Sequence, residues 1–319
     1  MHVLVTGATG FIGRATVEML APGGSVTAAV RKTSSRLAES VRQVVVGDLN
    51  ADTDWAEALD GVDAVIHLAG RAHILKETNG DGSAEFKQVN VDAANQLFEQ
   101  AQAVGVERFV FVSSIGVNGS GQDTDYRGNG YKGSDPPNPC EPYAVSKLEA
   151  EKLLEQTDLN YVIVRPPLVY GPEVPGNMRV LLDAVASGKT LPIKGIHNRR
   201  SFISVRNLAD FLCKAAATRS PARVTVTVAD QEVISSSKLA IELADLLGVK
   251  PNLISLPLSL VKAGAGVLGR KRTYQSLFGS LVVDSSEAVD LFRWAQPETQ
   301  AAGMRKMTEW YKAEVGAKR

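Results

Sequence analysis

A tyrosine and a lysine stand four residues apart in the segment Tyr143-Ala-Val-Ser-Lys147, where the residue spacing is helical. Residues four apart lie on one face of a helix, so the phenol and the ammonium would be neighbours. A free tyrosine has a pKa near 10, and a neighbouring cation favours its phenolate. Pro142 suits the first helical position, which puts Tyr143 in the first turn, where the helix dipole acts in the same direction. The pair therefore predicts proton transfer to or from an alcohol.

Two serines, Ser113 and Ser114, follow an apolar run at residues 109–112 that has the composition of a buried strand. A hydroxyl at the carboxyl end of such a strand can hydrogen-bond a substrate oxygen and orient it toward the phenol. Each serine could instead cap the turn that follows the strand. Both interpretations stay open at this stage.

A glycine-rich turn follows the first apolar strand, in Val3-Leu-Val-Thr-Gly-Ala-Thr-Gly-Phe-Ile-Gly13. Gly7 can turn sharply with a positive φ, Gly10 leaves room for a pyrophosphate, and Gly13 lets the following helix pack closely. Free amides at the helix start would face the anion, although a glycine-rich turn without a ligand is the alternative. The residues predicted to bind a dinucleotide here are Gly7, Thr9, Gly10, Phe11, Ile12 and Gly13.

The elements that must position these side chains alternate between short apolar strands and helices. Such alternation predicts a doubly wound (Rossmann) parallel sheet of the α/β class, with helices on both faces. We expect this dinucleotide-binding domain at residues 1–170, rejoined by about 201–220, and a smaller C-terminal substrate-binding α/β lobe at 171–200 and 221–319. Strands are predicted at 26–30, 43–46, 64–68, 108–112 and 161–164, and helices at 13–20, 55–59, 89–104 and 143–156.

Composition excludes several classes of function. Lys plus Arg and Asp plus Glu each total 35, so the protein has no net charge that would attract nucleic acid or a membrane surface. Cys140 and Cys213 are far apart, and the histidines lack ligand spacing, so we expect neither disulfides nor a metal. No signal-peptide pattern precedes the first strand, which predicts a cytoplasmic protein. The apolar stretch 253–268 is too short and interrupted for membrane insertion, and a helix covering a pocket is expected there.

Several motifs occur together in family-like order, and with them the chain resembles the extended short-chain dehydrogenase/reductase family, in its nucleotide-sugar epimerase, dehydratase and reductase branch. The resemblance covers nearly the whole chain. The motifs are TGATGFIG from Thr6, GDLN from Gly47, HLAG from His67, VSSIGVNG from Val112, YAVSK from Tyr143, RPPLVYGP from Arg165 and RSFISV from Arg200.

The resemblance implies a catalytic trio of Ser114, Tyr143 and Lys147, in which Lys147 also hydrogen-bonds the nicotinamide ribose. It implies that Asn177 and Arg200 hold the diphosphate of a nucleotide sugar, with Arg199 as an alternative to Arg200. Relatives often form homodimers through two helices, which here would be those at 89–104 and 143–156. The resemblance also implies cofactor contacts from Asp48, Leu49, Leu68, Ala69, Gly70, Pro167 and Val169.

The choice of cofactor depends on the end of the second strand, where a carboxylate would accept from the ribose hydroxyls and repel a 2′-phosphate. This chain has Arg31 and Lys32 there, with Arg36 close behind. Guanidinium and ammonium groups favour an added phosphate. We therefore predict NADP(H) as the preferred cofactor, with NAD(H) as the alternative.

The reaction is constrained by the residues after Ser114. Dehydratases of the resembled branch have an aspartate and a glutamate there, whereas this chain has Ile115-Gly116, so dehydration is not expected. Resemblance to the group that forms UDP-N-acetylquinovosamine favours reduction of a UDP-4-keto-6-deoxy sugar in surface-polysaccharide synthesis. The alternatives are a UDP-hexose or UDP-N-acetylhexosamine 4-epimerase with retained NAD, and a dinucleotide-binding regulator without turnover.

Overall fold

A seven-stranded parallel sheet forms the larger part of the computed structural model, with the strand order β3-β2-β1-β4-β5-β6-β9. The structure describes residues 1–72, 83–256, 275 and 278–316. The strands of this sheet are β1 (His2–Thr6), β2 (Ser25–Val30), β3 (Arg42–Val45), β4 (Ala64–His67), β5 (Arg108–Val112), β6 (Tyr161–Arg165) and β9 (Val224–Thr227). The predicted Rossmann-type parallel sheet is confirmed.

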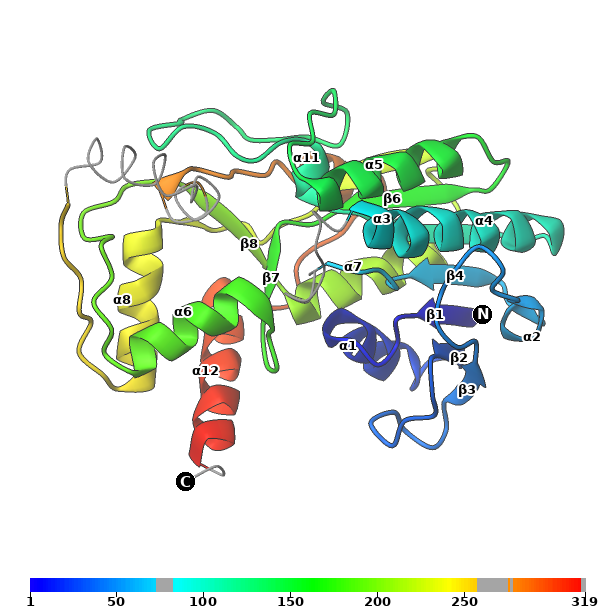
Figure 1. Cartoon of the computed structure of the whole chain (residues 1–319), viewed down its shortest axis with the longest axis horizontal. Coiled ribbons are helices and arrows are strands. Elements are labelled where there is room, and N and C mark those ends of the chain that lie inside the picture. The colour runs from blue at the N-terminus through cyan, green and yellow to red at the C-terminus, as the bar shows by residue number, and fades with distance from the viewer. Residues whose placement is uncertain (73–82, 257–274, 276–277, 317–319) are drawn as a thin grey trace.

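Helices cover both faces of the sheet, as Figure 1 shows with α4 and α5 above it and α1 and α7 below it. Alternate residues of each strand pack on opposite faces of the sheet. Phe109 and Phe111 pack on the face covered by α4 and α5, and Val110 packs on the face covered by α1 and α7. The face covered by α4 (Ala93–Ala103) and α5 (Pro142–Glu155) also carries α2 (Ala56–Leu59), with α3 (Ser83–Phe86) against α5. The face covered by α1 (Phe11–Leu20) and α7 (Val205–Ala217) also carries α11 (Ser286–Phe292).

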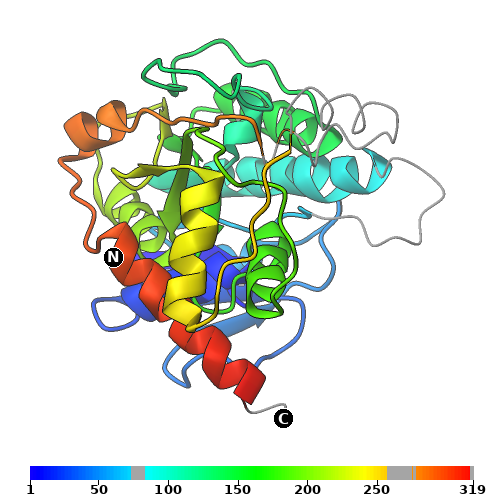
Figure 2. The ribbon, with the colours of Figure 1, turned by 90° about the vertical axis from the view of Figure 1, so that its left-hand side faces the viewer.

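A smaller unit packs beside the sheet around the strand order β10-β8-β7. Its helices α8 and α12 lie against each other, as Figure 2 shows in yellow and red. Its elements are β7 (Leu168–Tyr170), α6 (Gly176–Ala186), β8 (Arg200–Ser204), β10 (Val233–Ile234), α8 (Ser236–Leu247) and α12 (Gln300–Gly316). The chain returns to the face of the large sheet at α7, and then adds the edge strand β9 and packs α11 on the same face as α7; β9 and α11 lie beyond residue 220.

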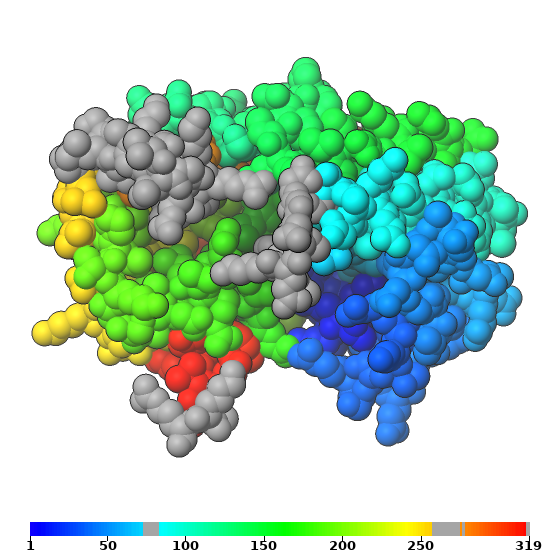
Figure 3. Space-filling view, in the orientation of Figure 1, coloured from blue at the N-terminus to red at the C-terminus, as the bar shows by residue number. Residues whose placement is uncertain are grey.

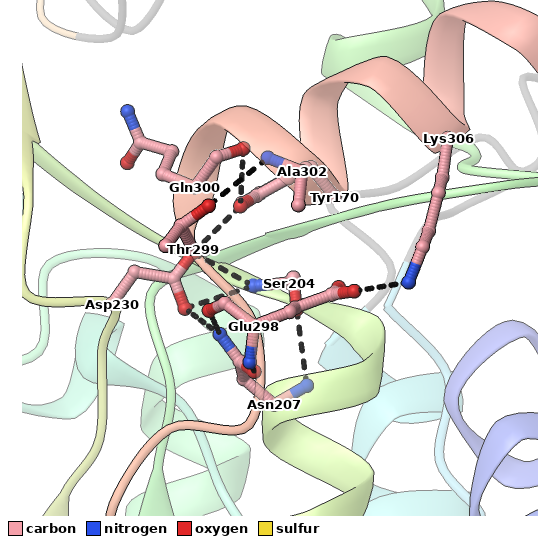
Figure 4. Close-up of polar contacts among 9 residues, drawn as sticks. All are labelled: Tyr170, Ser204, Asn207, Asp230, Glu298, Thr299, Gln300, Ala302 and Lys306. Atoms are coloured by element: carbon pink, nitrogen blue, oxygen red, sulfur yellow. Dashed lines mark hydrogen bonds and ion pairs between the residues drawn. The ribbon is translucent and has the colours of Figure 1, made fainter.

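A buried carboxylate, Asp230, joins the two units (Figure 4). Its oxygens accept from the Tyr170 hydroxyl and the Asn207 amide, both at 2.7 Å, and from the backbone N–H of Ser204 at 3.2 Å. Asn207 also donates to the Glu298 carbonyl at 3.0 Å, just before α12. The network therefore holds β7, the start of α7 and the start of α12 together.

The long glycine- and proline-rich segment at 116–142 lies across the segment before α11. Gln122 pairs with Ser280 and Tyr131 with Val283 through isolated backbone bridges, so both stretches are fixed together above the sheet edge. The helix expected at 253–268 falls mainly on residues 257–268, which lie outside the described residues. No helix within the described ranges is long and apolar enough to cross a membrane.

Candidate functional site

The glycine turn between β1 and α1 is built with no space for side chains. Gly7 has a φ of +65°, and a Cβ on it would lie 2.8 Å from the Ala69 nitrogen. A Cβ on Gly13 would lie 2.1 Å from the Gly7 carbonyl oxygen, whereas one on Gly10 would meet that oxygen at 3.1 Å. Gly7 and Gly13 are thus needed for close backbone packing, and Gly10 leaves the surface of the turn bare.

Thr6 ties this turn to the strand beside it. Its hydroxyl oxygen accepts from the backbone N–H groups of Leu68 and Ala69 at 3.2 and 3.1 Å, and therefore donates to His67 Nδ1 at 2.8 Å. Burial lowers the pKa of His67 to about 3, so the imidazole is neutral. The sequence analysis missed Thr6, although its place directly before Gly7 could have suggested a link to the next strand.

A cavity of about 780 Å³ opens beside the turn. Figure 3 shows the dark-blue start of the chain recessed between blue and cyan residues and green ones. Nine predicted cofactor residues line the cavity: Gly7, Thr9, Gly10, Arg31, Asp48, Leu49, Leu68, Ala69 and Gly70. Residues not predicted from sequence also line it: Thr6, Ala29, Val30, Val46, Gly47, Trp55, Arg71, Ala72, Gln88 and Val89.

Other predicted cofactor residues lie outside the described wall of this cavity. Phe11 packs against the core of the smaller unit and Ile12 against the lower core of the sheet, so their side chains serve packing. Lys32 is exposed. Pro167 lies just before β7, and Val169 lies within it. The turn thus presents its backbone, not these apolar side chains, to the cavity.

The basic residues after β2 have different partners. Arg31 lines the cavity, and its Nη1 lies 3.7 Å from Asp48 Oδ1, with both side chains largely exposed. Arg36 instead forms an ion pair with Glu173, whose Oε2 also lies 2.6 Å from Nη2 of Arg14. Arg31 is therefore the member of this basic group that borders the cavity.

Lys147 lies buried on α5, next to the cavity wall. Its Nζ donates to the Val112 carbonyl at 3.0 Å and lies 4.7 Å from the centre of the Phe111 ring. A Cβ on Gly70, which lines the cavity, would be 3.3 Å from the same nitrogen. Burial lowers the pKa of Lys147 to about 8, against the opposing effect of the Glu151 carboxylate.

Tyr143 lies in the first turn of α5, as predicted, with its ring centre 5.9 Å from that of Phe86. Burial raises the pKa of the phenol to about 12. The lowered pKa expected from the sequence is therefore wrong, because burial disfavours the charged phenolate. Tyr143 carries its proton at neutral pH.

Ser114 has the turn-capping role that the sequence left open. Its Oγ accepts from the Gly116 N–H at 3.1 Å and so caps a short helical turn, Ile115–Val117, while its own proton can be donated elsewhere. A Cβ on Gly116 would lie 3.4 Å from this Oγ and 3.3 Å from the Ala144 Cβ, so the capped turn lies against the start of α5. The Ser113 Oγ is buried and has no hydrogen-bond partner among the described residues.

Asn90, which was not predicted from the sequence, joins the cavity wall to α5. Its Oδ1 accepts from the Arg71 N–H at 2.8 Å, and its Nδ2 donates to the Arg71 carbonyl and to Ser146 Oγ, both at 3.0 Å. Ser146 in turn donates to the Tyr143 carbonyl at 2.8 Å. Asn90 belongs to a π-helical segment, Lys87–Asp92, a conformation often found at functional sites.

The residues expected to hold a diphosphate lie in the smaller unit. Asn177 is exposed in the first turn of α6. Arg200 begins β8, where its Nη1 donates to the Gly279 carbonyl at 2.9 Å and burial lowers its pKa to about 10. Arg199 donates from Nη1 to the Gly128 carbonyl at 3.0 Å.

Comparison with known proteins gives matches over nearly the whole chain. Residues 3–228 match the model of the NAD dependent epimerase/dehydratase family. The UDP-glucose 4-epimerase of Vibrio cholerae is 32% identical over 318 residues, covering 96% of this chain and 94% of that protein. The ceramide reductase of Caulobacter vibrioides is 30% identical, covering 80% and 73%. Among solved structures, MoeE5 in complex with UDP-glucose and NAD has a TM-score of 0.77 at 25% identity, covering 99% of this chain and 100% of that one.

Proposed function

Because the chain belongs to the NAD-dependent epimerase/dehydratase family, we propose that it transfers hydride at carbon 4 of a UDP-linked sugar. The observation that carries this proposal is the place of Lys147, whose Nζ lies against Gly70 in the wall of the 780 Å³ cavity. Lys147 of the proton-transfer pair thus lies directly behind the wall of the cavity that the glycine turn also lines. A bound nicotinamide would supply or accept the hydride there.

The residues around the cavity fit a dinucleotide. Gly10 and Gly7 expose backbone at the start of α1, where helix amides attract a pyrophosphate. Asp48 and Leu49 also line the cavity and offer the hydrogen-bonding and apolar groups that an adenine ring needs. Arg31, with no carboxylate on β2 beside it, supports a preference for NADP(H) over NAD(H).

We favour reduction of a UDP-4-keto-6-deoxy-N-acetylhexosamine. In this reaction Tyr143 donates its proton to the carbonyl oxygen at carbon 4, and Ser114 donates a hydrogen bond to the same oxygen. The ammonium of Lys147 stabilises the tyrosinate that remains. Tyr143 keeps its proton at neutral pH, as a proton donor must at the start of the reduction.

Epimerisation at carbon 4 is the second candidate. The Vibrio cholerae relative favours it, because the similarity extends over nearly the whole length of both chains. Here Tyr143 would first remove the hydroxyl proton and later return a proton to the same oxygen. The keto sugar would rotate in the site between the two steps. Asn177 and Arg200 remain our proposal for the diphosphate site in either reaction.

One experiment separates the candidates. The protein is incubated with NADPH and a UDP-4-keto-6-deoxy sugar, and separately with UDP-glucose or UDP-N-acetylglucosamine without added cofactor. Stoichiometric loss of NADPH in the first reaction supports the reductase, and interconversion without net redox change in the second supports the epimerase. Failure of both, with dinucleotide still bound, supports the non-catalytic regulator.

Tyr143→Phe tests the assigned chemistry directly. Removing the phenolic oxygen should leave dinucleotide binding close to that of the parent protein and reduce turnover by at least about 10²-fold. Binding is measured by cofactor fluorescence and turnover by NADPH consumption or sugar interconversion. Unchanged turnover would mean that Tyr143 is not the proton donor.

We also propose a homodimer through α4 and α5. Val145 is 38% exposed on the outer side of α5, where a second copy could cover it. Light scattering of the purified protein tests this proposal, since a monomeric mass across micromolar concentrations would contradict it.

A further inference from the structure

A buried ion pair lies behind the catalytic helix, between Glu151 of α5 and Arg165 at the end of β6. The two side chains are 1% and 5% exposed. Nε and Nη2 of Arg165 donate to the two carboxylate oxygens at 2.9 and 2.5 Å. Removing two charges from water costs free energy, and a well-packed apolar pair often stabilises a fold as much as a buried ion pair does. The pair therefore suggests a role beyond stability.

Arg165 extends the pair to the turn that carries Ser114. Its Nη1 donates to Asn118 Oδ1 at 3.1 Å and to the Gly133 carbonyl at 3.4 Å. The Asn118 amide donates to the Lys132 carbonyl at 2.8 Å. These contacts fix the turn after Ser114, and the long segment that follows it, against β6.

Glu151 stands one helical turn after Lys147 and two turns after Tyr143. Side chains four residues apart on a helix are neighbours. The Glu151 carboxylate opposes the effect of burial on Lys147 and favours its ammonium form. Glu151 therefore lies on the same helical face as the catalytic pair, one turn further from the cavity.

Among the described residues, the other groups that contact Lys147 carry no charge at neutral pH. His67 of β4 is neutral, because burial keeps its pKa near 3. Phe111 and the Val112 carbonyl of β5 offer a ring face and a neutral acceptor. Tyr143, on the same helix, keeps its proton, with a pKa of about 12.

We propose that Glu151 is a positioning residue for the reaction: it holds Lys147 as an ammonium and, through Arg165, fixes the turn that carries Ser114. This inference rests on the proposed function, which gives Lys147 and Ser114 their roles. Glu151 itself does not reach the reacting atoms. It acts through the two groups that do.

Glu151→Gln tests the proposal, because glutamine keeps the length of the side chain and one acceptor for Arg165 but removes the charge. The first measurement needs no turnover: the Lys147 side chain is titrated by NMR with ¹³C-labelled lysine, its signal assigned by its loss in Lys147→Arg. The midpoint should fall by about one pH unit in Glu151→Gln. It should not move in the matched control Glu149→Gln, whose side chain is exposed on the same helix. An unchanged midpoint in Glu151→Gln overturns the proposal.

Turnover gives the second readout. The alkaline limb of the kcat/KM profile should move to lower pH by the same amount in Glu151→Gln and stay in place in Glu149→Gln. A uniform loss of activity with no shift of the limb would mean that the pair is only structural. If the protein turns over no UDP-sugar, the proposed function fails, while the NMR titration still decides the effect of Glu151.

A second variant keeps the proposal testable if Glu151→Gln does not fold. Glu151→Gln/Arg165→Gln replaces both charges with neutral groups, so no unpaired ion remains buried. The Lys147 midpoint should again fall, because the carboxylate, not the guanidinium, acts on its pKa. A midpoint equal to that of the parent protein contradicts the proposal.

Discussion

Gly13→Ala should damage the fold itself, and the structure indicates by how much. The added Cβ would lie 2.1 Å from the Gly7 carbonyl oxygen and 2.8 Å from Ala8 Cα, where real Cβ atoms stay beyond about 3.0 Å. Both neighbours are backbone, so no side chain can rotate away, and α1 must shift by about 1 Å from the turn. Overpacking a core costs about 1–3 kcal/mol, and we expect the upper end of that range.

Gly10→Ala is the matched control, because its Cβ meets the Gly7 oxygen at 3.1 Å and its φ of −76° suits alanine. This variant should lose less than about 1 kcal/mol of stability. It places a methyl group on the cavity wall, however, so we expect dinucleotide affinity to fall by about tenfold or more, or about 1.4 kcal/mol.

The two variants are compared by urea denaturation without cofactor and by dinucleotide binding at 25 °C. Gly13→Ala should unfold at clearly lower urea with an unchanged m-value, and Gly10→Ala should unfold like the parent protein yet bind weakly. A Gly13→Ala protein of parental stability would refute the packing argument. Parental affinity in Gly10→Ala would refute the assignment of the turn as the pyrophosphate site.

Three further predictions concern charged groups. Burial lowers the pKa of Lys147 from 10.5 to about 8, so the buried ammonium destabilises the fold fully below pH 8 and less as pH rises to 10.5. Lys147→Met should therefore have a Tm a few degrees higher than that of the parent protein at pH 7. A lower Tm would contradict this. Arg31→Ala should weaken NADPH binding about tenfold and leave NADH binding unchanged, whereas equal loss for both would remove its proposed role. Asp230→Asn should cost about 2–3 kcal/mol in urea unfolding, since an amide nitrogen cannot accept from Tyr170 or Asn207; parental stability would show that the network is dispensable.

The family and the fold were both predictable from the sequence, and both predictions are confirmed. Turn glycines and alternating apolar runs report local geometry and burial, which nearby residues decide. Gly7 has the predicted positive φ, and Tyr143 lies in the first turn of its helix because Pro142 begins it. The preference for NADP(H) and the diphosphate residues stay predictions.

Partners that are distant in the chain were not predictable in the same way. Arg36 was counted with Arg31 among the charges that favour a 2′-phosphate, yet it pairs with Glu173, 137 residues away. Asn90 belongs to no motif, and the motif that Thr6 begins does not indicate its contacts, because the roles of both residues arise only where strands and helices meet. No local pattern specifies which of many exposed or buried groups will be adjacent after folding.

The sequence by itself determined that a tyrosine, a lysine and a glycine turn belong to one α/β fold, because their spacing within a helix and a turn is local. The tertiary structure decided their pKa values. Tyr143 has a raised pKa and Lys147 a lowered one, because burial in the assembled core penalises whichever form carries charge. Only the packed fold sets that burial, and only it places the Glu151–Arg165 pair behind them.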